Sequence, residues 1–262
     1  MKYWIVFLSL ICATAQAAGA CKTVRIGYSD RERAPYYMGN GGEVPAKPGV
    51  LVELMRDAFR AVGCPVELVR LPVARVRLAL SSGAVDIAPA DTPADDNAGY
   101  VIATLAGGDP DNRRALRTAA YVFVRTADHL PADTDPTQYF KNRTLAANQG
   151  TVLAQHLKEA GLRIDDGSFS SWNNLDKLLM NRVDGFTLAL MSPGALDSYV
   201  ANRYGKQVTR LDKPARVSYM WLGANRDYYQ RNREQVEAVW NWIGSHGSQQ
   251  VELLTRKYVL LP

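Results

Sequence analysis

The sequence contains little of what most enzymes and nucleic-acid-binding proteins need. Its three histidines are far apart in the chain and lack metal-ligand spacing. They are His129, His156 and His246. There is no Gly-x-Ser-x-Gly elbow and no phosphate-binding glycine loop. The net charge is only +5, and the basic residues are scattered along the chain. We therefore predict no catalytic residues, no metal, no cofactor and no nucleic-acid partner.

Long apolar runs are also missing, except for one at the N-terminus. That run covers residues 3–13, which is too short to span a bilayer, and it follows the positive charge of Lys2. Small residues come next, and both 15–17 (Ala-Gln-Ala) and 18–20 (Ala-Gly-Ala) fit a small-x-small cleavage pattern. We interpret residues 1–20 as a signal peptide that is cleaved after residue 17 or after residue 20. A retained membrane anchor is the alternative.

Cysteine is scarce, and cleavage would remove Cys12 and leave only Cys21 and Cys64. An even pair in an exported protein indicates a disulfide. Each of the two lies just before an expected strand, at residues 23–28 and 66–71. If these strands are parallel neighbours, their first residues lie about 4.8 Å apart, within the roughly 4.4–6.8 Å that a disulfide allows between Cα atoms. We predict a Cys21–Cys64 bridge. Two free thiols, or a lipidated Cys21, are the alternatives.

Strand patterns and helix patterns alternate along the rest of the chain. Strands at 24–28, 66–71 and 85–88 alternate with helices at 50–62 and 72–80, an order that predicts a parallel sheet with right-handed crossovers. Residues 91–117 interrupt this pattern with Pro, Gly and Asp, as expected between two lobes. The alternation then restarts, with strands at 119–125, 144–147, 162–164, 186–190, 207–211 and 217–222 and helices at 151–160, 172–182 and 194–202. Two C-terminal helices are expected at 227–244 and 248–258.

Several short motifs follow one another over nearly all of the chain after residue 20. They are Ile26-Gly27-Tyr28-x-Asp30, Pro35-Tyr36-Tyr37, Gly49-Val50-x-x-Glu53-Leu54, Leu71-Pro72-x-x-Arg75, Leu80-x-x-Gly83-x-x-Asp86-Ile87, Gln149-Gly150-Thr151 and Val183-Asp184-Gly185. In their order and spacing they resemble the family 3 extracellular solute-binding proteins, the periplasmic receptors of amino-acid-type ABC importers.

The resemblance implies an α/β protein with a two-lobed periplasmic-binding-protein type II fold. Each lobe would be a mostly parallel sheet of strand order 2-1-3-n-4 flanked by helices, and two crossover strands, near residues 114–118 and 211–216, would join the lobes. Lobe 1 would comprise residues 21–115 and 214–262, and lobe 2 residues 116–213. The resemblance further implies a periplasmic monomer without enzyme activity that binds a small-molecule ligand and an ABC permease in the inner membrane.

In the first lobe, the candidate ligand contacts follow a strand or open a helix, the places where parallel sheets bind small ligands. They are Asp30, Tyr36, Tyr37, Arg75, Asp91 and Thr92. Arg75 opposes the dipole of its helix, which favours a role in binding a ligand carboxylate. Pairing with Asp91 or Asp30 is the alternative. The tyrosines would either form a wall of the site or pack within their own loop.

In the second lobe, the candidates are Gln149, Gly150, Thr151 and Trp172. Gly150 allows backbone N–H groups to approach a ligand, and Thr151 begins a helix beside the positive end of its dipole. Thr151 could instead only cap that helix. Trp172 either stacks on the ligand or begins its helix as a core residue.

Two departures from the family pattern bear on the ligand. Members that bind α-amino acids usually carry an Arg after the third strand and an Asp after a later strand of lobe 2. Here residues 91–95 are Asp-Thr-Pro-Ala-Asp, and residues 188–191 contain no acid. These departures argue against a standard α-amino acid as the ligand. The expected ligand is a small polar solute, either amino-acid-like or a small carboxylate.

Three functions remain open at this point. The first is capture of that solute and its delivery to an ABC importer. The second is an exported enzyme on the same fold, similar to cyclohexadienyl dehydratase, for which Asp30 and Asp91 are the available acids. The third is a receptor that senses the ligand without transport.

Overall fold

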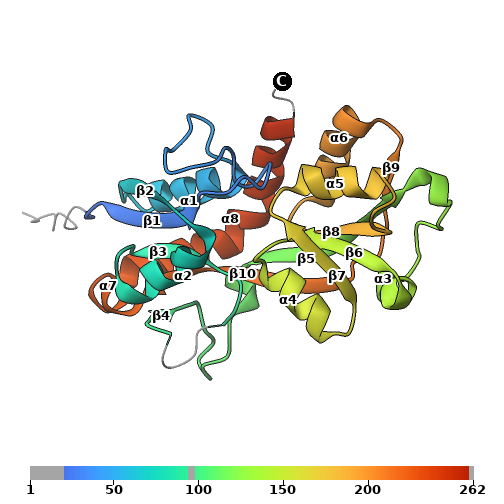
Figure 1. Ribbon diagram of the computed structural model, residues 1–262. Coiled ribbons are helices and arrows are strands. Elements are labelled where there is room, and N and C mark those ends of the chain that lie inside the picture. The colour runs from blue at the N-terminus through green and yellow to red at the C-terminus, as the bar shows by residue number, and fades with distance from the viewer. Residues whose placement is uncertain (1–20, 94–97, 260–262) are drawn as a thin grey trace, which may run out of the picture.

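The structure is a computed structural model that describes residues 21–93 and 98–259. The expected signal peptide and its cleavage sites lie outside the described residues, as does Asp95. The described chain forms two α/β lobes, which lie side by side in Figure 1, with the N-terminal half of the chain (blue to teal) on the left. No helix in the described ranges is long and apolar enough to cross a membrane.

Lobe 1 consists of one mixed sheet and the helices that cover it. Its strands are β1 (Val24–Ser29), β2 (Val66–Leu71), β3 (Ile87–Ala90), β4 (Tyr100–Val101) and β10 (Arg216–Asn225). Its helices are α1 (Val50–Ala61), α2 (Val73–Ser82), α7 (Arg226–Arg231) and α8 (Arg233–Val259), with a 3-10 turn η1 (Asn112–Arg114). β1 pairs in parallel with β2 and β3, and β10 runs antiparallel to β3 and β4. The strand order is therefore β2-β1-β3-β10-β4.

Lobe 2 repeats this arrangement. Its strands are β5 (Leu116–Arg125), β6 (Thr144–Asn148), β7 (Arg163–Ser168), β8 (Gly185–Leu190) and β9 (Val208–Arg210). Its helices are α3 (Pro136–Tyr139), α4 (Val152–Glu159), α5 (Ser171–Leu179) and α6 (Pro193–Tyr204), with 3-10 turns η2 (Thr126–Asp128) and η3 (Phe140–Asn142). β6 lies between β7 and β8, and β5 lies between β8 and β9. Both lobes thus have the expected order 2-1-3-n-4.

β5 and β10 join the two lobes. Residues Leu116–Ala120 pair antiparallel with Arg216–Met220, so that the strands of both lobes form one continuous sheet. The remainder of each strand belongs to the sheet of one lobe: β5 pairs with β8, and β10 pairs with β3. The division of the chain between the lobes near residues 115 and 214 stays a prediction.

The predicted break between the two C-terminal helices is wrong. The sequence placed it at residues 244–248, where glycines interrupt the pattern, but α8 is continuous there and begins directly after Asn232. Gly244 and Gly247 instead permit close packing. A Cβ on Gly244 would lie 2.8 Å from the carbonyl oxygen of Arg113, and one on Gly247 would lie 2.8 Å from Cδ2 of Leu116. The two glycines let α8 approach the segment that leads into β5.

β7 extends beyond the predicted strand at 162–164. Its last residues are polar, so the apolar pattern used for the prediction did not include them. Asp165 and Asp166 lie within it and pair with Lys177 and Lys158 at 2.7 and 2.8 Å. β7 is an edge strand that pairs only with β6 among the described elements. Edge strands tolerate charged side chains, so an apolar pattern underestimates their length.

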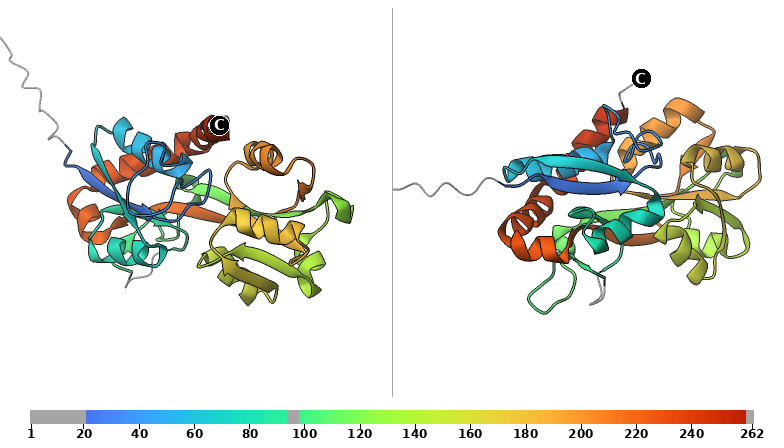
Figure 2. Two further views of the ribbon diagram at one scale, coloured as in Figure 1. Left: turned by 45° about the horizontal axis from the view of Figure 1, so that its top comes forward. Right: turned by 60° about the vertical axis from the view of Figure 1, so that its left-hand side comes forward.

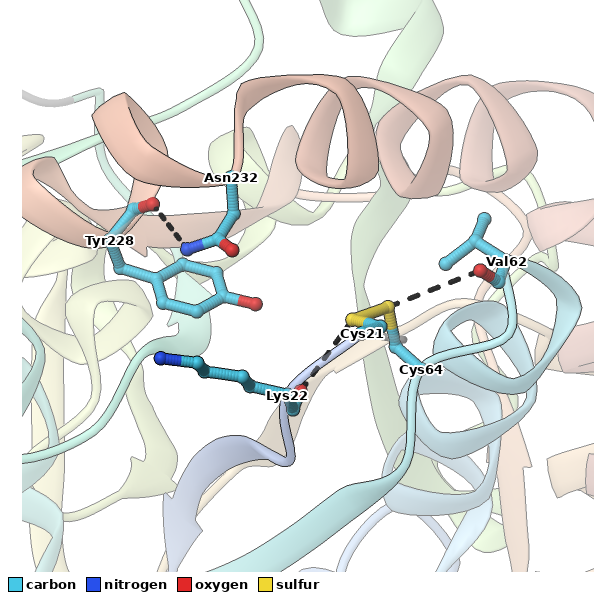
Figure 3. The surroundings of a disulfide bond; sticks show 6 residues. All are labelled: Cys21, Lys22, Val62, Cys64, Tyr228 and Asn232. Carbon is cyan, nitrogen blue, oxygen red and sulfur yellow. Dashed lines mark hydrogen bonds between the residues drawn. A yellow bond between two sulfur atoms is a disulfide. The ribbon is translucent and has the colours of Figure 1, made fainter. Parts of the chain in front are cut away.

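The predicted disulfide is confirmed. Cys21 and Cys64 are bonded, and their Cα atoms lie 5.0 Å apart. The bond, drawn in Figure 3, lies just before the first residues of β1 and β2. Val24 of β1 pairs with Val66 of β2 in parallel register. The expected proximity of the two strand starts therefore holds.

Candidate functional site

The described residues form a cavity of about 450 Å³ between the loop that follows β1 and the second lobe. Lobe 1 contributes Arg31, Glu32, Arg33, Ala34 and Asn40 to its lining. The polar part of the lobe 2 lining comprises Gln149, Gly167, Ser168, Ser170, Ser171 and Asn173. Its apolar part comprises Phe123, Phe169, Trp172, Leu175, Phe186, Leu188, Leu196 and Val200. Both lobes therefore bound the same space.

A tight turn holds the lobe 1 side of this cavity. The N–H of Tyr36 donates to the carbonyl of Arg33 at 2.9 Å, and the N–H of Arg33 donates to the carbonyl of Tyr37 at 2.9 Å. The Ala34–Pro35 peptide bond within this turn is cis. The turn thereby places the Arg33 side chain at the cavity.

The β2 residue Arg70 fixes the rest of this loop. Its guanidinium donates to the carbonyl oxygens of Met38 at 3.3 Å, Gly39 at 2.6 Å and Glu43 at 2.7 Å. These charge-assisted bonds satisfy loop carbonyls that have no strand partner. A residue of the sheet thus holds the segment that covers the site.

The same loop contacts lobe 2 directly. The N–H of Met191, just after β8, donates to the hydroxyl of Tyr36 at 2.8 Å. The guanidinium of Arg31 lies 5.4 Å from the ring centroid of Phe169. Farther from the cavity, α6 packs against the C-terminal helix α8, as the left view of Figure 2 also shows. The lobes therefore touch on more than one side of the site.

Two loops of lobe 2 are held together by a buried amide network. Asn148 donates to the hydroxyl of Ser171 at 2.9 Å, and Asn174 donates to the Asn148 side-chain oxygen at 3.0 Å. Asn174 is fully buried. The N–H of Gln149 donates to the carbonyl of Ser168 at 2.8 Å. The loop after β6 and the loop after β7 consequently present their polar groups to the cavity as one unit.

Three charged residues of lobe 1, Arg31, Glu32 and Arg33, line the cavity, and Asp91 interacts electrostatically with Arg33. Nε of Arg33 is buried and has no hydrogen-bond partner in the described part of the chain. Its guanidinium lies 5.1 Å from the ring centroid of Tyr37. Asp91 directly follows β3. Desolvation by the surrounding protein raises the pKa of the Asp91 carboxyl, and the charge of Arg33 opposes that rise.

The structure brings some of the predicted site residues to the cavity and leaves others outside it. Gln149 and Trp172 line the cavity, and Trp172 also contacts Tyr204, with ring centroids 5.9 Å apart. Gly150 has a φ of 72°, which favours glycine, and a Cβ there would lie 4.0 Å from Cε1 of Phe169. Thr151 caps α4, since its hydroxyl accepts from the Ala154 N–H at 3.2 Å. Capping does not exclude a ligand contact.

None of the lobe 1 candidates is among the described residues that line the cavity. Tyr36 is buried in the contact with lobe 2, and Tyr37 stacks on Tyr28 with ring centroids 6.1 Å apart. The Asp30 carboxylate lies 3.8 Å from Nε of Arg31. Asp91 and Thr92 follow β3. Arg75 is exposed near the start of α2.

Sequence reasoning missed three parts of the site: Arg33, Phe169 and the serines around it. Arg33 had a signal, because it stands in the loop after a strand and just before the Pro-Tyr-Tyr motif. The Ser-Phe-Ser-Ser stretch at 168–171 was missed because the preceding strand was predicted to end at residue 164. In the described ranges, no group of His, Cys, Asp and Glu side chains could hold a metal ion.

No protein-family model and no curated protein matches the chain. Solved structures do match. An amino acid ABC transporter substrate-binding protein, AbpA from Streptococcus pneumoniae, bound to L-arginine, has a TM-score of 0.63 at 13% identity, covering 92% of this chain and 97% of its own. A histidine kinase sensor domain with similarity to periplasmic binding proteins has a TM-score of 0.62 at 15% identity, covering 89% and 96%.

A third match is AncCDT-1, an ancestral amino acid-binding protein described as a precursor of cyclohexadienyl dehydratase. Its TM-score is 0.59 at 16% identity, with coverage of 90% and 95%. At these identities the likeness shows the fold. The chain therefore has the two-lobed fold of the type II periplasmic binding proteins, as the motifs implied.

Proposed function

We propose that this chain is an exported solute-binding protein that captures a small polar solute, amino-acid-like or a small carboxylate, between its two lobes. The observation that carries the proposal is the cavity of about 450 Å³ with lining residues from both lobes. Small-molecule sites commonly have volumes of about 300–1,000 Å³. A solute of this size would contact both lobes at once.

The connection between the lobes supports a hinge. β5 and β10 cross from one lobe to the other as an adjacent pair. Lobes that are joined by a narrow connection can close around a ligand, and a ligand that contacts both lobes stabilises only the closed arrangement. We propose further ligand contacts from residues at the edges of the cleft. They are Asp30, Tyr37, Arg75, Asp91 and Thr92 of lobe 1 and Gln149, Gly150, Thr151 and Trp172 of lobe 2.

We further propose that the protein acts as a periplasmic monomer that delivers its solute to an ABC permease in the inner membrane. The likeness to an ABC transporter substrate-binding protein supports this role. Export is testable by the intact mass of the periplasmic form, which should begin at Ala18 or Cys21. A periplasmic form that retains Met1 would contradict it.

The alternatives are sensing without transport and catalysis. The likeness to a kinase sensor domain is compatible with sensing, and the likeness to a dehydratase precursor is compatible with catalysis. An enzyme needs an acid placed at the substrate. Among the described residues that line the cavity, Glu32 alone carries a carboxylate, and it accepts a hydrogen bond from the Gly39 N–H at 3.1 Å. This engagement within the loop favours binding over catalysis.

A thermal-shift screen against polar amino acids, small carboxylates, polyamines and opines tests the proposal. A solute at a hundred times its Kd should stabilise the folded protein by about 2.7 kcal/mol. X-ray scattering with the best solute should show compaction. Binding without compaction would contradict the two-lobed clamp, and conversion of the solute into a product would identify an enzyme. Uptake of the labelled solute by cells with and without the protein separates transport from sensing.

A further inference from the structure

The floor of the cavity is apolar and belongs to lobe 2. It is formed by side chains of β5, β8, α5 and α6, namely Phe123, Leu175, Phe186, Leu188, Leu196 and Val200. Each of these residues is at most 6% exposed. Protein interiors are ordinarily packed without large voids, and ordered water requires polar partners that such a floor lacks. The floor is therefore suited to an apolar group of a solute.

Two aromatic side chains stand beside this floor. The ring of Trp172 lies 4.7 Å from the guanidinium carbon of Arg203 and 5.9 Å from the ring centroid of Tyr204. These contacts hold it in place. Phe169 is 44% exposed, and the guanidinium of Arg31 lies over its ring. Flat rings around an apolar floor are suited to enclosing a planar or branched group.

The lobe 1 side of the cavity offers the cation of Arg33, which forms no ion pair in the described ranges. Nε of Arg33 is buried and has no hydrogen-bond partner in the described ranges. A buried donor without an acceptor is costly, and a carboxylate is the acceptor that a guanidinium binds best. Arg33 is thus the part of the lining that would recognise an anionic group.

The acidic side chains near Arg33 do not take this place. The Glu32 carboxylate accepts from the Gly39 N–H, and the Asp30 carboxylate lies 3.8 Å from Arg31. Asp91 interacts with Arg33 electrostatically, but the described residues include no ion pair between the two. Arg33 lines the cavity, and the described acidic residues form no ion pair with it, so its positive charge is available to a solute.

We propose that the solute is a small carboxylate that bears an aromatic or branched apolar group. Its carboxylate binds Arg33 of lobe 1, and its apolar group lies on the floor formed by lobe 2. This inference rests on the proposed function and specifies its ligand. Because each lobe recognises a different half of the molecule, a solute that has only one half bridges the lobes poorly.

Calorimetry with matched probes tests this division. Phenylacetate, phenylalanine and leucine carry both halves, acetate and alanine lack the large apolar group, and benzylamine lacks the carboxylate. We expect at least one probe with both halves to bind at least tenfold more tightly than acetate, alanine and benzylamine. Whether phenylacetate or phenylalanine binds better reports only whether the site also accepts an ammonium group.

Three variants assign the halves to the two lobes. Arg33→Gln should weaken binding of the best probe at least tenfold. Arg77→Gln, an exposed arginine of α2 outside the cavity lining, should leave it unchanged. Val200→Phe fills the floor and should weaken the same probe. Thermal melting without ligand shows whether each variant is folded. Arg33 is only partly buried, so Arg33→Gln provides the decisive comparison if Val200→Phe does not fold.

The outcomes separate this inference from the proposed function. If a wholly polar solute binds tightly and neither Arg33→Gln nor Val200→Phe weakens it, the ligand class is wrong while the solute-binding function stands. If no small solute of any class binds to the folded protein, the proposed function itself fails.

Discussion

Replacing Tyr36 with phenylalanine tests whether the lobes are coupled through the loop that follows β1. The Tyr36 hydroxyl accepts a hydrogen bond from the Met191 N–H of the other lobe at 2.8 Å, and the residue is 1% exposed. Burial raises the pKa of this hydroxyl, so it remains neutral at physiological pH. Tyr36→Phe retains the ring and removes only the oxygen. The variant therefore removes this one hydrogen bond between the lobes without creating a cavity.

The expected size of the effect follows from the energy of one neutral hydrogen bond. Such a bond contributes about 0.5–1.5 kcal/mol, which corresponds to a factor of about two to twelve in an equilibrium constant. If the bond forms only when the lobes are together, its loss shifts the equilibrium between open and closed arrangements by that factor. Ligand affinity should fall by up to the same factor, because only the closed form is stabilised by the ligand.

The assay combines X-ray scattering without ligand and calorimetry with the best solute. Tyr36→Phe should increase the radius of gyration and weaken binding. Tyr228→Phe is the matched control, because Tyr228 is also a buried tyrosine of lobe 1 but its hydroxyl has no hydrogen-bond partner in the described part of the chain. It should change neither quantity. If Tyr36→Phe behaves like this control, the contact with Met191 does not couple the lobes.

Three further predictions concern the disulfide, the C-terminal helix and Arg75. Thiol titration of the denatured, unreduced mature protein should detect no free thiol, and reducing the Cys21–Cys64 bond, with a sequence separation of 43, should cost about 3–4 kcal/mol; two free thiols would refute the pairing. Burial would raise the pKa of Glu53, but hydrogen bonds from Lys257 and Tyr258 outweigh it and lower that pKa. The ionised Glu53 therefore stabilises the fold above its ordinary pKa of 4.5, and this stability is lost as the pH falls below 4.5. The melting temperature of Glu53→Gln should depend less on pH in this acid range. Equal pH profiles for the two proteins would contradict this. Arg75→Ala should weaken ligand binding by about 1.5–3 kcal/mol if Arg75 reaches the ligand carboxylate in the closed form, and by nothing measurable in calorimetry if Arg33 alone does so.

Local patterns were sufficient to predict most elements of this protein. In α1, the residues Val50, Leu51, Leu54 and Ala58 recur at helical spacing and are fully buried, as the alternation of apolar and charged residues predicts. The positions of the two cysteines before neighbouring strands predicted the disulfide, because parallel strands begin at the same edge of a sheet. The strand order in each lobe followed from the resemblance in motifs.

Where these local patterns failed, packing between segments distant in sequence determined the secondary structure. Gly244 and Gly247 interrupt the helical pattern, yet α8 continues through them because the segment near Leu116 lies against its surface. A local pattern cannot contain this information. The sequence pattern missed the polar end of β7 for a related reason. The aspartates of this strand form ion pairs with Lys158 and Lys177 of other elements.

The sequence by itself determined the order of strands and helices, the disulfide and the expectation of two lobes, because these depend on the spacing of residues along the chain. Only the tertiary structure brought Arg33 and the apolar floor to one cavity and joined Tyr36 to Met191, residues that are 155 positions apart. The cavity consists of surfaces from both lobes. Its shape and chemistry therefore depend on how the lobes meet, which is fixed by contacts between residues that are remote in sequence.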